Sequence, residues 1–89
     1  MTGRQTIAII EFMNAYGADN VVRSESWQCE TFSHLGGGCI HRLDIHDNRH
    51  IAWYRDGKSW RPDGKPATIT NNGREYYYNE NGTVNRYSR

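Results

Sequence analysis

Histidine and cysteine, which often bind transition metals, are concentrated in the middle of the chain: Cys29, His34, Cys39, His41, His46 and His50. The first four of these supply enough ligands for a tetrahedral zinc ion. Only Cys39 and His41 would share a strand face, however, and a triple glycine separates them from the other two. We therefore favour the alternative in which both cysteines are small buried residues on adjacent strands and the histidines are partly exposed. We predict no metal or other cofactor.

A second group, rich in histidine and aspartate, overlaps the first: His41, Asp44, His46, Asp47 and His50. Metal-dependent nucleases bring such ligands together with a general base. On a strand, however, His41 faces one way while Asp44 and His46 face the other, and no helix follows to complete a nuclease motif. We therefore predict no catalytic residues and no enzymatic activity, with a metal-dependent nuclease as the remaining alternative.

The elements that position these residues begin with a helix predicted over residues 3–16. Apolar side chains recur there at spacings of about three and four residues: Ile9, Ile10, Phe12, Met13 and Tyr16. Gly17 is expected to end this helix, and Thr2 or Thr6 to cap its start. The apolar stripe is either a lid over a sheet, which we favour, or a surface for a partner.

Residues 21–32 alternate in the manner of β-structure, which predicts one long strand or two shorter ones. Gly36, Gly37 and Gly38 follow, and three consecutive glycines suit a flexible loop or a place where another backbone comes close. A phosphate-binding loop is not expected, because the lysine of that motif and its following helix are absent.

Turn dipeptides then recur at short intervals: Asp47-Asn48, Asp56-Gly57, Asp63-Gly64, Asn72-Gly73 and Asn81-Gly82. Asp-Gly and Asn-Gly are strong hairpin signals because the tight turns of hairpins need positive φ. Strands are expected between the turns, over residues 49–55, 58–61, 66–70, 74–79 and 83–87. The fold class is therefore α+β: an N-terminal helix packed on a twisted antiparallel β-meander of five or six strands. We expect one domain over residues 1–89, with the sheet spanning about 21–88.

An internal repeat strengthens this prediction of a meander. Residues 53–61 (WYRDGKSWR) match residues 77–86 (YYNENGTVNR) with one insertion. Together with Pro62-Asp63-Gly64-Lys65-Pro66-Ala67, the unit resembles a MORN-like hairpin repeat of phage-encoded and uncharacterised bacterial proteins, over about residues 38–89. Trp60 replaces the usual histidine of that repeat, and Lys65 interrupts its Gly-Pro-Ala. The resemblance implies a β-meander and a phage origin, and it brings no catalytic residues.

Length and composition exclude several classes of protein. The chain has 89 residues, a net charge of +1 and a mean hydropathy of −0.92. It has no apolar run near the roughly 20 residues that cross a bilayer, and Glu11 and Asn14 interrupt any secretory core near the start. We expect a cytoplasmic protein, in the host cytoplasm if the chain is phage-encoded. A disulfide between Cys29 and Cys39 is not expected in that compartment.

The second half of the chain combines most of the aromatic residues with an excess of basic over acidic ones. Such a sheet has three interpretations: a purely structural one, a protein-binding surface rich in Trp, Tyr and Arg, and a nucleic-acid-binding surface that stacks bases. We predict that seven residues contact a partner: Tyr54, Arg55, Trp60, Arg61, Arg74, Tyr77 and Arg86.

These observations favour a small non-catalytic phage-type protein that binds and inhibits a host macromolecular complex, for example a bacterial defence system, in the manner of an anti-CRISPR protein, or the transcription machinery. The alternative is a nucleic-acid-binding module that uses the basic aromatic sheet, with a zinc-binding domain less favoured. No membrane contact is expected. An uncovered edge strand would allow a dimer.

Overall fold

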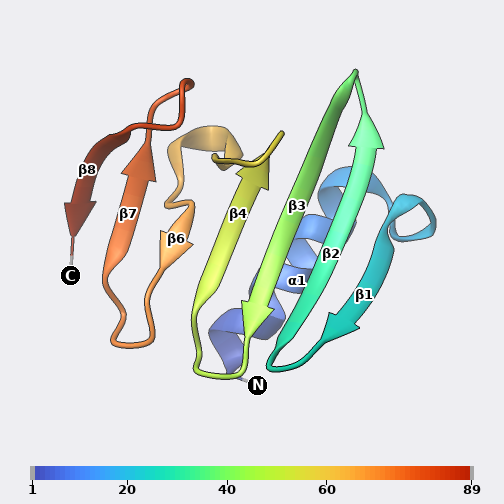
Figure 1. Ribbon diagram of the computed structural model, residues 1–89, viewed down its shortest axis with the longest axis horizontal. Helices are drawn as coiled ribbons and strands as arrows, with labels where there is room; N and C mark the ends of the chain where they lie inside the picture. Colours follow the sequence, from blue (N-terminus) through green and yellow to red (C-terminus); the bar gives the residue numbers. More distant parts are fainter. Residues whose placement is uncertain (1, 89) are drawn as a thin grey trace.

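The computed structural model describes residues 2–88, which form one helix and an antiparallel sheet of eight strands (Figure 1). The elements are α1 (Gly3–Tyr16), η1 (Ala18–Asn20), β1 (Val22–Ser26), β2 (Cys29–Gly36), β3 (Cys39–His46), β4 (Ile51–Arg55), β5 (Lys58–Ser59), η2 (Pro62–Gly64), β6 (Thr68–Ile69), β7 (Glu75–Tyr78) and β8 (Val84–Ser88). The predicted α+β class is confirmed. Within residues 2–88, no helix is long and apolar enough to cross a membrane.

Helix α1 occupies the range that the apolar spacing predicts. Thr2 caps it through a capping box, in which the Thr2 hydroxyl accepts a hydrogen bond from the Gln5 backbone N–H while the Gln5 side chain accepts one from the Thr2 N–H. Gly17 ends the helix with φ 85°, and its N–H donates to the Met13 carbonyl at 2.8 Å. Only glycine reaches this φ without strain, so the helix stops there.

The strands lie in the order β1-β2-β3-β4-β6-β7-β8, and short β5 pairs with β4. The prediction of five or six strands was too low. The short β5 and β6 fall within expected ranges. The additional strands are β3, which no expected range covers, and a second strand in residues 21–32, which break at Trp27 and Gln28. Gln28 takes a left-handed φ of 61°, so the chain reverses there into a hairpin.

The triple glycine is a tight turn in this fold and not a flexible loop. Gly37 and Gly38 have φ values of 62° and 77°, which place both in the left-handed region between β2 and β3. Two consecutive positive φ angles are the requirement of a type I′ hairpin turn, whose twist matches that of the strands. The turn therefore sets the register in which His34 lies opposite His41.

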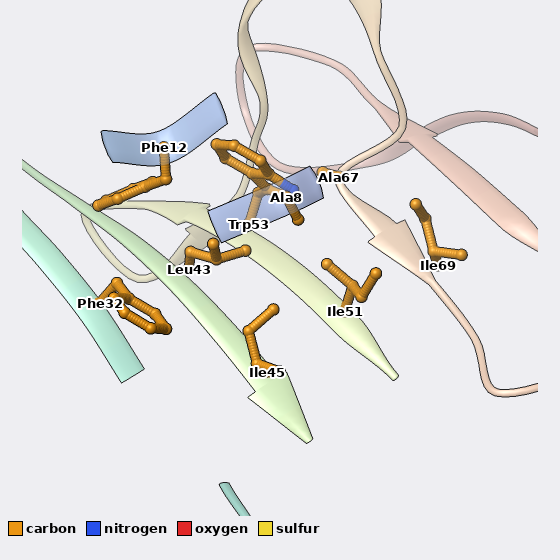
Figure 2. Close-up of a cluster of buried hydrophobic side chains, with 9 residues drawn as sticks. All are labelled: Ala8, Phe12, Phe32, Leu43, Ile45, Ile51, Trp53, Ala67 and Ile69. Atoms are coloured by element: carbon orange, nitrogen blue, oxygen red, sulfur yellow. The ribbon is translucent and has the colours of Figure 1, made fainter. Parts of the chain in front are cut away.

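The hydrophobic core lies between α1 and one side of the central strands (Figure 1). Figure 2 shows its buried members converging from α1, β2, β3, β4, β6 and the segment before β6: Ala8, Phe12, Phe32, Leu43, Ile45, Ile51, Trp53, Ala67 and Ile69. The strand residues of this core all face α1 because every second residue of a strand faces the same side of the sheet. The helix is therefore a lid over the sheet, as the sequence favoured.

The segment between β5 and β6 covers the same side of the sheet next to α1. Arg61 anchors it: the guanidinium lies over the Trp53 ring at 4.5 Å, forms an ion pair with Glu11 of α1 and donates to the Pro66 carbonyl at 3.0 Å. Among residues 2–88, no helix or loop covers the opposite side of the sheet, which we call the open face (Figure 1).

Candidate functional site

The open face carries a row of four half-buried or exposed tyrosines flanked by two arginines, which we call the tyrosine face: Arg42, Tyr54, Arg74, Tyr76, Tyr78 and Tyr87. Its groups stack in pairs. The Arg42 guanidinium lies 4.2 Å from the centre of the Tyr54 ring, and the Tyr76 and Tyr87 rings stack with centroids 5.8 Å apart. The Arg74 guanidinium lies 5.6 Å from the Tyr87 ring.

Strand register places these residues together. Arg42 lies opposite Tyr54 in the β3–β4 pair, Ala52 lies opposite Thr68, and Thr68 in turn lies opposite Tyr76. Alternation then brings the side chains of strands β3, β4, β6, β7 and β8 to one side. The Thr68 hydroxyl donates to the Tyr78 hydroxyl oxygen at 3.3 Å, which fixes that ring within the row.

The tyrosine face has little net charge. Asp44 lies 3.2 Å from Arg42 and offsets its charge. Burial raises the pKa of Tyr54, the negative charge of Asp44 raises it further, and Arg42 partly opposes both effects. The phenol is therefore a neutral hydrogen-bonding group at physiological pH. The second cation of the row, Arg74, lies against the Tyr87 ring.

An exposed aliphatic patch borders the tyrosine face on the same side of the sheet. Leu35 and Ile40 lie opposite each other at the tip of the β2–β3 hairpin, 73% and 53% exposed, and Val22 on β1 is 66% exposed. Val22 lies opposite Ser33, one step along from Leu35 on the open face. These three exposed apolar residues occupy neighbouring positions on one face, an arrangement that often marks a protein interface.

The seven predicted contact residues do not form one surface. Tyr54 and Arg74 belong to the tyrosine face, whereas the other five lie on the helix side of the sheet: Arg55, Trp60, Arg61, Tyr77 and Arg86. The Arg55 guanidinium lies 4.1 Å from the Trp60 ring and pairs with Glu80 at 2.8 Å.

Tyr77 and Arg86 form a separate cation–π pair at 3.8 Å. Arg61 has a side chain only 9% exposed, so it anchors the loop beside the helix. The structure brings Arg61, Tyr77 and Arg86 together around one pocket, whereas Arg55 and Trp60 form a separate pair and Tyr54 and Arg74 lie on the open face.

Four members of the tyrosine face were missed by sequence reasoning: Arg42, Tyr76, Tyr78 and Tyr87. The signal that identifies them is alternation, since Tyr76 and Tyr78 share a side that Tyr77 does not. The register shift between Tyr77 and Tyr78 hides this relation from β8, because one extra residue, Asn85, lies between their partners Arg86 and Val84.

The four candidate zinc ligands, Cys29, His34, Cys39 and His41, are not brought together. Cys29 lies opposite His46 at one end of the β2–β3 hairpin, whereas Cys39 lies opposite Gly36 at the other end. Both cysteines are free thiols and half-buried, so the expectation of buried cysteines is only partly met.

His34, Cys39 and His41 share the helix side. The Tyr16 ring stacks there on His34 and His41, with centroids 5.0 and 4.7 Å away.

The histidine–aspartate group is divided between the two sides, as strand alternation predicts. His41 packs on the helix side, where burial and the positive charges of His34 and Arg55 lower its pKa. Asp44 and His46 lie on the open face, and His50 follows with its ring 5.2 Å from that of His46. Burial and the proximity of His46 likewise lower the pKa of His50.

Comparisons with protein-family models, with curated proteins and with solved structures give no match to this chain. The functional assignment therefore depends on the two sheet faces. The helix side is filled by core packing and by internal aromatic–arginine pairs. The open face holds the tyrosine face and the aliphatic patch, both without cover from any other part of residues 2–88.

Proposed function

We propose that this protein is a non-catalytic binding protein that holds a protein partner on its open face. The observation that carries this proposal is the continuous surface made by the tyrosine face and the neighbouring aliphatic patch. Tyrosine and arginine are enriched where protein interfaces concentrate their binding energy. Tyrosine offers a large contact area, and few side-chain torsions become fixed when it binds. Its hydroxyl can also form a hydrogen bond at the edge of an interface.

A protein partner fits this surface better than a nucleic acid. Nucleic-acid binding depends on several cations that neutralise phosphates. On the open face Arg42 is offset by Asp44, while Arg55, Arg61 and Arg86 lie on the other side of the sheet. The exposed aliphatic side chains Leu35 and Ile40 favour a partner that is itself partly apolar.

The resemblance of residues 38–89 to phage-type repeats supports a more specific form of the proposal. The partner would then be a host macromolecular complex in the bacterial cytoplasm, such as a defence system or the transcription machinery, and binding would inhibit it. The exposed β1 and the outer strand β8 both end the sheet, so a dimer through either edge is compatible with an accessible open face.

Affinity capture with paired variants tests the proposal. The tagged protein is incubated with nuclease-treated bacterial lysate, and the bound proteins are identified by mass spectrometry. We expect a partner that is lost with Tyr87→Ala and with the double variant Leu35→Ser/Ile40→Ser, since these residues are 62%, 73% and 53% exposed and can change without loss of the core.

The matched control is Ile7→Ser/Ile10→Ser, which removes aliphatic side chains of similar exposure, 58% and 53%, from the outer side of α1. It should retain the partner. Circular dichroism of all variants confirms that they fold. Equal capture by open-face and control variants would disprove the proposed surface. A partner captured from a parallel untreated lysate but not from the nuclease-treated one, or affinity that falls steeply with salt, would instead identify a nucleic-acid-binding module.

A further inference from the structure

Three potential metal ligands meet on the open face, beside the Arg42 end of the tyrosine face: Cys29, Asp44 and His46. The thiol sulfur, a carboxylate oxygen and an imidazole nitrogen all lie within 4.8 Å of one another. The strand register brings these side chains together: Cys29 lies directly opposite His46 in the β2–β3 pair, and Asp44 precedes His46 by two residues, so it faces the same side. The strands therefore hold the ligands without help from a flexible loop.

The Asp44 carboxylate is ion-paired with Arg42, but its Oδ1 lacks a hydrogen bond from the described residues. Its side chain is only 14% exposed, and its Oδ1 is buried without a hydrogen bond from any described residue, although Arg42 Nε lies 3.2 Å away. Burying a charged oxygen without a hydrogen bond is costly. A bound cation would add a partner to this carboxylate, whose second oxygen is free of the Arg42 contact made by Oδ1.

The surroundings leave room for an ion and one further ligand. A pocket of about 500 Å³ opens beside Cys29 and His46, and Trp27, Gln28, Asp47 and Asn48 complete its lining. The His50 ring lies beside the His46 ring, with centroids 5.2 Å apart. An ion bound by the three ligands would thus be accessible from the solvent.

We propose that Cys29, Asp44 and His46 bind a zinc ion, with the fourth position open to water or to a ligand in the adjacent pocket. Thiolate and imidazole favour zinc over magnesium or calcium, which prefer oxygen ligands alone. Zinc accepts sulfur, nitrogen and oxygen ligands in tetrahedral geometry, and three protein ligands leave one position free. On binding, the Cys29 thiol loses its proton to solvent, and the charges of thiolate and carboxylate balance those of the ion. We assign no reaction to the ion.

Cobalt(II) substitution tests this site directly. The purified protein, kept reduced with a phosphine, is titrated with Co²⁺ and monitored by absorption spectroscopy. We expect visible bands of tetrahedral cobalt, a near-ultraviolet charge-transfer band from the thiolate, and loss of both on addition of Zn²⁺. Cys29→Ser should remove the charge-transfer band and weaken metal binding by at least about tenfold, and Asp44→Asn should weaken it similarly.

Cys39→Ser is the matched control, because it removes the other cysteine, which lies at the opposite end of the same hairpin. It should leave the spectrum and the affinity unchanged. Circular dichroism shows whether each variant folds, and Asp44→Asn provides an independent test if Cys29→Ser is unfolded. Two outcomes would overturn the proposal: no thiolate band in the wild-type protein, which indicates at most a His46–His50 pair, or a band that depends on Cys39.

Discussion

Replacement of Arg61 by alanine tests whether this residue holds the fold together or contacts a partner. Its guanidinium is sandwiched between the core and α1, where it makes a cation–π contact with Trp53, a hydrogen bond to Pro66 and an ion pair with Glu11. All three interactions are lost in Arg61→Ala. The loss falls on stability because the side chain is only 9% exposed and offers almost no surface to another molecule.

The expected loss of stability can be derived from these contacts. A largely desolvated cation–π contact contributes about 1–2 kcal/mol, and a hydrogen bond from a charged donor about 1.5 kcal/mol. The Glu11 side chain is 36% exposed, so solvent screening limits the ion pair to less than about 1 kcal/mol. We expect the free energy of unfolding to fall by about 2–4 kcal/mol, a large share of the roughly 5–15 kcal/mol typical of a domain.

Urea denaturation measures this change. With an m-value of about 1.5 kcal/mol/M, the unfolding midpoint should fall by about 2 M. Circular dichroism and tryptophan fluorescence should give coincident transitions. The control is Arg86→Ala, which removes a cation–π contact with Tyr77 at an exposed position and should cost less than about 1 kcal/mol. If Arg61→Ala unfolds within about 0.5 kcal/mol of the wild-type protein, the structural role assigned to Arg61 is wrong.

Four further substitutions probe other parts of the fold. Gln5 is buried and donates to the His46 carbonyl at 2.7 Å, so Gln5→Leu should lower the free energy of unfolding by about 1–3 kcal/mol in urea melts. The pKa of His41 is lowered in the folded protein, so its stabilising contribution is present above about pH 6.5 and is lost as the pH falls through the lowered folded-state pKa. Thermal melts should therefore show a midpoint that decreases from about pH 7.5 to about pH 5.5, and decreases less in His41→Gln. Gly38 has φ 77°, so Gly38→Ala should destabilise by about 1 kcal/mol, whereas Gly3→Ala in the first turn of α1 should stabilise by up to about 1 kcal/mol.

Each of these expectations has a contrary outcome. A stable Gln5→Leu variant would mean that the carbonyls near the N-terminus of α1 find other donors. An equal pH dependence in wild type and His41→Gln would assign the titration to a different group. A neutral or favourable effect of Gly38→Ala would be incompatible with the left-handed turn between β2 and β3.

The sequence predicted those features that depend on near neighbours. Helix α1 follows from apolar spacing and from its two caps, and the Asp56-Gly57 and Asn81-Gly82 turns lie between strands as their φ requirements suggest. The break at Gln28 carried no such signal, because glutamine rarely adopts a positive φ. Strand number was therefore the weakest part of the fold prediction.

The candidate site was harder to predict because it depends on contacts between distant segments. Arg61 was expected at a surface, yet its partner Glu11 lies 50 residues away in the sequence and holds it against the side of the helix. The side on which Tyr77 falls is set by register with β6 and β8, which the sequence of β7 alone does not determine. Likewise Cys29, Asp44 and His46 meet only because the β2–β3 hairpin turns at Gly37 and Gly38.

Strand β6 is short, so the β7–β8 hairpin is weakly attached to the rest of the sheet. It joins the central strands to the β7–β8 hairpin through only two residue pairs with β4, Ile51 with Ile69 and Ala52 with Thr68. No residue of β7 or β8 is fully buried. Subglobal opening of this hairpin should thus cost far less free energy than global unfolding, with fast amide hydrogen exchange in β7 and β8. Tyr54 on β4 and Tyr76 on β7 lie on opposite sides of β6. A partner bound to both residues would therefore slow amide exchange in β7 and β8, because its binding would order this hairpin.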